Sequence, residues 1–235
     1  MKKLFPVFFV FAICCTLIVS CSKEPIDPIV RSFSNAGFTK IDAGDQHRFT
    51  ITSGTSFSIV ARGEERDIND LLVQNAGDLL KIEYNRYKPN RKRVTFTITM
   101  PSLEGVMLAG QSQATISGFS ETVPVTLNMS GQAACWIHVN APKFFAQASG
   151  QSKIEFLGGS STGLETNASG QSEILAYGLM PVVTATAIAT GQSTIKLKVG
   201  NSLNADASGQ SRIYYQGNPP IKNIIQTGSA RIIQE

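Results

Sequence analysis

The sequence predicts an all-β protein: a parallel β-helix, or β-solenoid, of about seven rungs of about 20 residues, closed by an N-terminal antiparallel β cap. Three observations lead to this fold class. A Gly-Gln-Ser motif recurs along the second half of the chain, apolar and polar residues alternate on both sides of it, and no helical periodicity continues for more than about two turns. Internal repeats with a period near 20 residues are typical of stacked architectures.

Residues 1–20 are predicted to be a signal peptide of the lipoprotein type. Lys2 and Lys3 precede an apolar stretch that runs from Leu4 to Val19 and is too short for a stable spanning helix. Ser20 directly before Cys21 resembles a lipobox, which implies cleavage before Cys21 and acylation of its sulfur. Acyl chains of this kind hold a domain on a bilayer. The alternative is an ordinary secretory signal followed by a chance cysteine.

Residues 21–30 are expected to form an extended tether, because Pro25 and Pro28 punctuate a short polar stretch. The run Cys21-Ser22-Lys23-Glu24 resembles the export signal of surface lipoproteins in the Bacteroidetes. We therefore expect a cell-envelope, outer-membrane lipoprotein that is exposed at the cell surface.

Cysteine usage and charge exclude several function classes. Once the signal peptide and the lipid site are set aside, Cys135 is the one remaining cysteine, so no internal disulfide, zinc cluster or redox pair is expected. Removal of Lys2 and Lys3 lowers the formal charge from +4 to +2. This near balance does not indicate nucleic-acid binding. We expect no metal and no cofactor.

Residues 31–104 lack the motif and are expected to form the cap, since the ends of a solenoid expose strand edges that need a cover. Four runs are predicted to be strands: Arg48–Thr52, Phe57–Val60, Leu79–Tyr84 and Val94–Met100. A short helix or a turn is expected between Asp67 and Val73.

Residues 105–235 are predicted to form the solenoid. The motif glycines are Gly110, Gly131, Gly150, Gly170, Gly191, Gly209 and a degenerate Gly228. The fourth residue after each glycine is apolar, and Ile154, Ile174, Ile195 and Ile213 occupy this position in four consecutive copies. Two short strands therefore meet at each glycine corner, where the chain turns sharply. The alternative architectures are a propeller and an antiparallel sandwich. They are disfavoured because a propeller blade needs about 40 residues, and a sandwich would not require the same corner seven times.

The candidate ligand face is a column of six glutamines with two outward aromatic residues. The residues are Gln111, Gln132, Gln151, Gln171, Gln192 and Gln210, with Trp136 and Tyr214. Stacked amides can bond to one another as in cross-β ladders, and the serine column after the glutamines could do the same. The alternative is that both columns are structural and satisfy the backbone of the corner. The aromatic rings could stack on sugars or lie beneath loops.

A basic cluster formed by Arg86, Lys88, Arg91, Lys92 and Arg93 is expected at a solvated hairpin tip. Otherwise it could contact anionic lipid or an acidic glycan. The outward acids Glu155, Glu173 and Asp206 do not form the carboxylate pair that a polysaccharide-cleaving β-helix enzyme needs. We therefore expect no enzyme and no catalytic residue.

The run Thr99-Met100-Pro101-Ser102-Leu103, followed by Gly110-Gln-Ser and its serial copies, resembles the auto-transporter adhesin "head GIN domain" family of Bacteroidetes lipoproteins. The likeness covers about residues 34–233. It implies a right-handed β-helix, an envelope location and an adhesin role, and it carries no catalytic residues. Three hypotheses follow: a non-enzymatic lipoprotein that presents the solenoid to a polysaccharide or an envelope protein, a polysaccharide lyase or hydrolase, and a structural scaffold of an envelope complex.

Overall fold

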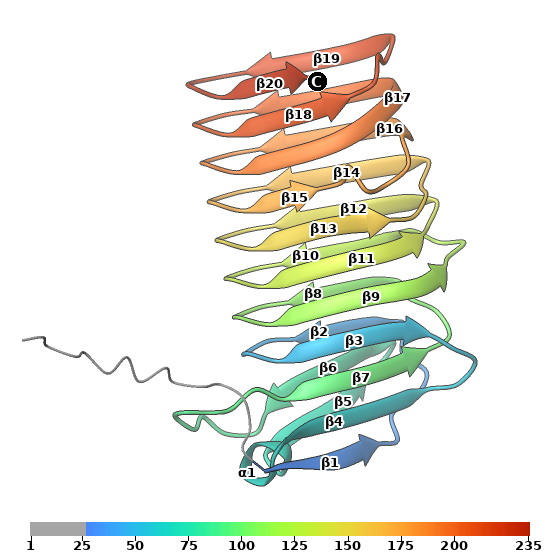
Figure 1. The fold of residues 1–235 in the computed structure, drawn as a ribbon, viewed down its shortest axis with the longest axis vertical. Helices are drawn as coiled ribbons and strands as arrows, with labels where there is room; N and C mark the ends of the chain where they lie inside the picture. The colour runs from blue at the N-terminus through green and yellow to red at the C-terminus, as the bar shows by residue number, and fades with distance from the viewer. Residues whose placement is uncertain (1–26) are drawn as a thin grey trace, which may run out of the picture.

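The computed structural model describes residues 27–235, which form a single stack of rungs (Figure 1). Each rung of the repeat region contributes one strand to each of two facing parallel sheets, here called sheet A and sheet B. Sheet A is the front sheet in Figure 1, and the tight corners that join the sheets line up along one edge of the stack. The predicted β-solenoid is therefore confirmed.

The repeat region begins at β8. Sheet B contains β8 (Gly105–Leu108), β10 (Val125–Met129), β12 (Lys143–Ala148), β14 (Gly163–Ala168), β16 (Val182–Ala189) and β19 (Ile221–Gln226). Sheet A contains β9 (Gln113–Ser120), β11 (Ala134–Asn140), β13 (Lys153–Gly158), β15 (Glu173–Leu175), β18 (Arg212–Gln216) and β20 (Arg231–Gln234). The long strand β17 (Thr194–Ala207) passes from sheet A into sheet B.

The inward columns of the two sheets form the core. Ile154 pairs with Ile174, Ile174 with Ile195, and Ile195 with Ile213, and all four side chains are fully buried. Equivalent residues of successive rungs therefore lie directly over one another, as the repeat predicts. Burial of an isoleucine side chain stabilises the fold by about 1.5–3 kcal/mol, and stacking repeats this gain in every rung. Small alanines occupy the facing column of sheet B and are also buried.

The corners explain why the motif contains glycine. Gly170 has a φ of +73°, and a Cβ built on it would lie 2.9 Å from the carbonyl oxygen of Gly150 in the rung before. That carbonyl accepts a hydrogen bond from the backbone N–H of Gln171 at 2.7 Å. A side chain at the glycine would therefore press on the backbone of the neighbouring rung as well as strain its own.

The N-terminal region contributes more to the stack than a cap. Its elements are β1 (Pro28–Phe33), β2 (Lys40–Ala43), β3 (Arg48–Ser53), β4 (Ser58–Glu64), α1 (Glu65–Ile68), β5 (Leu71–Ala76), β6 (Leu79–Tyr84) and β7 (Thr95–Met100). Strand β2 pairs in parallel with β6 and β8, and β3 pairs in parallel with β7 and β9. The strands β6 and β7 form one further rung, and β2 and β3 form another. The rung of β2 and β3 lies between the rung of β6 and β7 and the first repeat.

The expected antiparallel cover consists of the remaining strands. β4 pairs antiparallel with both β7 and β1, and β5 pairs antiparallel with β6. Strand β1 includes residues 28–30, which the sequence analysis assigned to the tether; their backbone groups are paired with β4. Where a short helix or a turn was predicted between Asp67 and Val73, the helix α1 lies earlier, at Glu65–Ile68, and residues 71–73 pair in β5.

An eighth copy of the corner joins β2 to β3 and was missed by the sequence analysis. In Ala43-Gly44-Asp45-Gln46-His47, Asp45 occupies the glycine position with a φ of +64°. A Cβ built on Gly110, in the next rung, would lie 2.5 Å from the carbonyl oxygen of Asp45. Aspartate is among the few residues that tolerate this conformation. The glycine has moved one position earlier and histidine replaces serine, so the motif is not recognisable by identity alone.

Candidate ligand-binding surfaces

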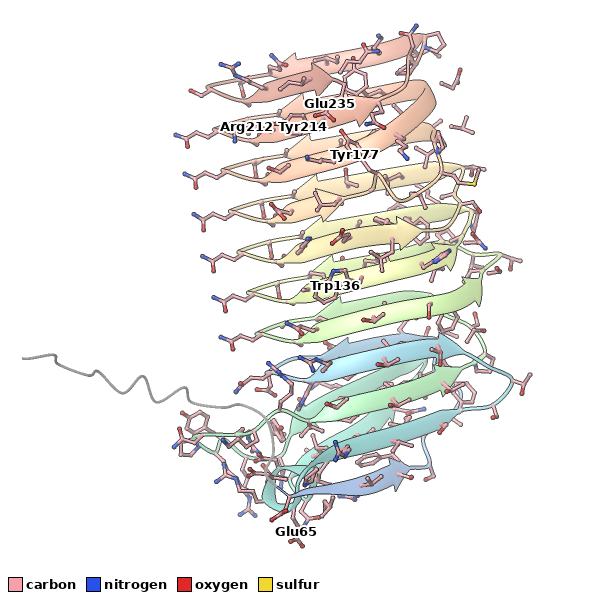
Figure 2. All side chains as sticks on the ribbon, viewed as in Figure 1. Glu65, Trp136, Tyr177, Arg212, Tyr214 and Glu235 are labelled. Carbon is pink, nitrogen blue, oxygen red and sulfur yellow. The ribbon has the colours of Figure 1, made fainter. Side chains whose placement is uncertain are left out.

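The six motif glutamines form a continuous amide ladder along the corner edge. The Nε2 of each glutamine donates to the Oε1 of the next: Gln111 to Gln132, Gln132 to Gln151, Gln151 to Gln171 and Gln171 to Gln192 at 3.1 Å, and Gln192 to Gln210 at 3.2 Å. All six side chains are exposed, and Figure 2 shows side chains projecting along this edge of the stack. The interpretation of the column as a ladder is confirmed. Each interior amide donates one hydrogen bond to one neighbour and accepts one from the other, which fixes the orientation of the amide.

The serines do not bond to one another as a second ladder, and the structural interpretation, in which they satisfy the corner backbone, is confirmed. Ser152, Ser172, Ser193 and their equivalents are buried, and their hydroxyls donate to backbone carbonyls. The Oγ of Ser172, for example, lies 2.9 Å from the carbonyl oxygens of Ala148 and Ser169. A buried carbonyl without a partner is costly, so the serines satisfy the corner backbone and are not available to a ligand.

Trp136 and Tyr214 lie in one outward column of sheet A, as their register predicts. The residues between them in this column are Glu155, Leu175 and Lys196. Figure 2 shows the two labelled rings at different levels of the front face, and both are partly buried. Lys196 lies 5.1 Å from the Tyr214 ring centroid and 5.8 Å from that of Tyr177. The two residues therefore do not form one aromatic platform, and their role as ligand contacts stays a prediction.

The basic cluster is a solvated tip only in part: Arg86 is exposed, but the side chain of Arg91 is buried. Its guanidinium forms ion pairs with Asp67, at 3.1 Å, and with Asp70, and it stacks 3.5 Å from the centroid of Tyr84. Lys88 joins the network through Asp70 at 3.1 Å. The hydrogen bond from Arg91 is the main reason that the pKa of Asp70 lies below its ordinary value. The cluster anchors the loop between β6 and β7 to the end of α1.

The outward acids lie on two faces of the molecule. Glu155 and Glu173 belong to adjacent columns of sheet A, whereas Asp206 lies on sheet B. Glu155 forms an ion pair with Lys153 at 2.9 Å. Cys135 is buried in the core, and burial raises the pKa of its thiol to about 12, which makes it a poor nucleophile. Within residues 27–235 no cluster of His, Cys, Asp or Glu could hold a metal ion.

The outer face of sheet B carries a surface hollow near the corner edge, here called the sheet B groove. It has a volume of about 400 Å³, and a smaller hollow of about 150 Å³ adjoins it through shared residues. The groove is lined by Asp42, Met107, Asn128, Gln147, Asn167, Ser130, Ser149 and Ser169, with parts of four neighbouring residues. This surface was not predicted from the sequence. The signal was present, since Asn128, Gln147 and Asn167 are the outward residues of three consecutive strands.

Over the described part of the chain, no helix is long and apolar enough to cross a membrane. Cys21 and the signal peptide lie outside the described residues, so the lipid-attachment prediction for Cys21 stays a prediction.

Solved structures share this fold. A protein described as a putative adhesin from Bacteroides fragilis has a TM-score of 0.81 and 21% identity, covering 90% of this chain and 99% of its own. One described as a putative lipid binding protein from Parabacteroides distasonis has a TM-score of 0.71 and 19% identity, covering 90% and 98%. A putative adhesin from Parabacteroides merdae has a TM-score of 0.65 and 14% identity, with the same coverage. No curated protein matches the chain.

A family model matches residues 37–219, which include the two N-terminal rungs and most of the repeats. The chain therefore belongs to the family described as "Putative auto-transporter adhesin, head GIN domain".

Proposed function

We propose that this protein is a non-enzymatic, lipid-anchored adhesin of the cell envelope, whose solenoid presents a rigid surface to a polysaccharide or a partner protein. Membership of the adhesin family supports an adhesin-like, non-catalytic role and an envelope or cell-surface setting. The observation that carries the proposal is the alignment of equivalent outward residues in successive rungs. Such a surface repeats the same chemistry along its length, as a repeating polymer does.

Attachment through Cys21 can be tested directly. In cells that make the full chain, the wild-type protein is expected in the membrane fraction and in the detergent phase after phase separation, because several acyl chains hold a domain firmly on a bilayer. A Cys21→Ala variant should lose both properties. Equal membrane association of the two forms would contradict the anchor, and protease treatment of intact cells separates surface exposure from a periplasmic location.

Adhesion can be tested with the detergent-solubilised full-length lipoprotein on an array of polysaccharides. Saturable binding to one class of glycan is the expected result. Turnover of a glycan would support an enzyme instead. Stable co-purification with envelope proteins, without any glycan binding, would support the scaffold hypothesis.

A further inference from the structure

The sheet B groove contains amide side chains that are not used by the protein itself. Among the described residues, the side chains of Asn128, Gln147 and Asn167 have no hydrogen-bond partner, although they stack in one outward column. The Oδ1 atom of Asn128 is buried without any partner. The amides of Gln147 and Asn167 are exposed, so their donors and acceptors are open to the hydroxyl groups of a ligand.

The glutamine ladder on the neighbouring edge differs in this respect. Gln151 lies in the same rung as Gln147, and Gln171 lies in the same rung as Asn167. The two ladder amides hydrogen-bond to each other and to their neighbours, whereas the two groove amides do not. The same chemical groups at the same level of the stack are therefore committed at the edge and available in the groove.

The charge of the groove favours an uncharged ligand. Asp42, at one end, is the single charged residue among those that line it, and none of them is a lysine or an arginine. In the adjoining hollow, Glu165 is neutralised by its ion pair with Lys143. An acidic glycan or a phosphate would find no cation in this lining and would be repelled by Asp42.

The spacing and the apolar flanks favour a sugar chain over a peptide. The three amides repeat at the rung spacing of about 4.8 Å, which is close to the length of one pyranose unit in an extended polysaccharide. Met107 precedes the amides in their column, Ile188 follows them, and Phe145 lies in the adjoining hollow. Such apolar side chains suit the C–H faces of sugar rings. A peptide could not add as a strand on this face, because the backbone of β12 already pairs with β10 and β14.

We propose that the sheet B groove binds an uncharged, extended polysaccharide that runs along the axis of the stack. Asn128, Gln147 and Asn167 hydrogen-bond to hydroxyl groups of successive sugar units, and Met107, Ile188 and Phe145 contact the apolar ring faces. The inference rests on the proposed adhesin function and assigns its ligand class and site.

The test compares two double variants of the full-length protein that remove the same chemistry from the same two rungs. The groove variant is Gln147→Ala with Asn167→Ala, and the matched edge variant is Gln151→Ala with Gln171→Ala. The probes are dextran, mannan, laminarin and soluble cellulose oligomers, with hyaluronan and alginate as acidic comparators, in affinity electrophoresis and calorimetry. The wild type is expected to bind an uncharged probe, and the groove variant to lose about tenfold in affinity, which corresponds to 1.4 kcal/mol. The edge variant should retain wild-type affinity.

Because Gln147 and Asn167 are exposed, the groove variant should keep the wild-type circular dichroism spectrum and melting temperature. A second, isosteric variant, Gln147→Glu with Asn167→Asp, alters the same amides without removing atoms and should also weaken binding.

Different results would overturn the groove assignment and the adhesin function. Binding that survives in the groove variant but is lost in the edge variant would overturn the groove assignment and leave the adhesin function standing. Preference for hyaluronan or alginate would overturn the uncharged ligand. No binding to any probe, together with a stable protein partner, would overturn both the groove and its glycan function.

Discussion

The two ends of the chain build the same stack by different means. The repeat region, from Gly105 onward, repeats one Gly-Gln-Ser corner. At this corner the backbone N–H of glutamine donates to the glycine carbonyl of the rung before, and the serine hydroxyl donates to a backbone carbonyl. The N-terminal region, residues 27–104, has one altered corner at Asp45 and none between β6 and β7, where a long loop is held by the buried pair of Arg91 and Asp67.

This difference reflects what each region must do. A rung inside the stack has neighbours on both sides, so repetition satisfies its backbone groups. The last rung at the N-terminal end has one such neighbour, and antiparallel strands and specific ion pairs replace the other. Aromatic side chains fill this end: Phe49 stacks on Phe96 at 5.1 Å, and Phe38 contacts Phe57 at 4.9 Å. We therefore expect substitutions in the two regions to have different energetic signatures.

The largest effect is expected for Arg91→Ala, which breaks the network specific to the N-terminal region. It leaves the fully buried Asp67 carboxylate without its main cation, and removal of one partner from a buried ion pair costs about 3–5 kcal/mol. Chemical denaturation measures the loss, and hydrogen exchange should show it concentrated in residues 27–104. The control Lys153→Ala removes a partly exposed pair with Glu155 and should cost less than about 1 kcal/mol. Similar losses in both variants would contradict the distinction.

The next effect is expected at a repeat corner. Gly170→Ala places a Cβ 2.9 Å from the Gly150 carbonyl oxygen at a φ of +73°, and we expect a loss of about 2–4 kcal/mol from clash and backbone strain together. Gly77→Ala is the matched control, because Gly77 has a φ of +64° but no atom near the added Cβ. It should lose only the strain, about 1–2 kcal/mol. Thermal unfolding of both variants separates the two causes, and equal losses would mean that the close stacking of corners is unimportant.

The altered corner predicts a dependence of stability on pH. His47 is buried where the other corners have serine, and burial, with repulsion from Arg91 as the smaller cause, lowers its pKa from 6.5 to about 3. The unfolded chain therefore binds a proton below pH 6.5 that the folded protein does not, so folding is favoured fully above that pH and less below it.

Between pH 7 and pH 5 this histidine should cost about 2 kcal/mol of stability, at 1.36 kcal/mol per pKa unit. His47→Phe, which suits the surrounding rings of Phe49, Phe96 and Tyr84, should flatten that part of the profile. Urea denaturation at each pH measures it, with the exposed His138→Gln as the control. An unchanged slope in His47→Phe would show that other groups dominate.

The smallest effect is expected for the exposed ladder. Gln151→Ala removes two amide hydrogen bonds, to Gln132 and Gln171, whereas Gln210→Ala removes the single bond at the end of the ladder. A hydrogen bond contributes about 0.5–1.5 kcal/mol, and exposure places these at the lower end. We expect losses of about 1 kcal/mol and about 0.5 kcal/mol in thermal unfolding. A larger loss of stability in Gln210→Ala than in Gln151→Ala would contradict the idea that each amide hydrogen bond of the ladder contributes equally.

Much of the structure of the repeat region could be predicted from its sequence, because the same pattern of residues recurs in each rung. The inward column of Ile154, the outward column of Trp136 and the order of the glutamine amides all follow from a period near 20 residues and the alternation of a strand. For the serines the sequence left two interpretations open, because spacing gives a column but not whether its hydroxyls point to solvent or to a carbonyl. The burial of Arg91 was missed because its two aspartates lie more than 20 residues earlier in the chain.

The sequence by itself determined the fold class, the positions of the seven motif corners and which residues share a column in the repeats, since periodicity requires only local information. Only the tertiary structure revealed that β2 and β3 stack between β7 and the first repeat, and that the amides of Gln147 and Asn167 line an open hollow. The first depends on a pairing between segments that lack the motif, which leaves no periodic trace. The second depends on the shape of the surface, since periodicity places side chains in a column but does not show whether they line a hollow.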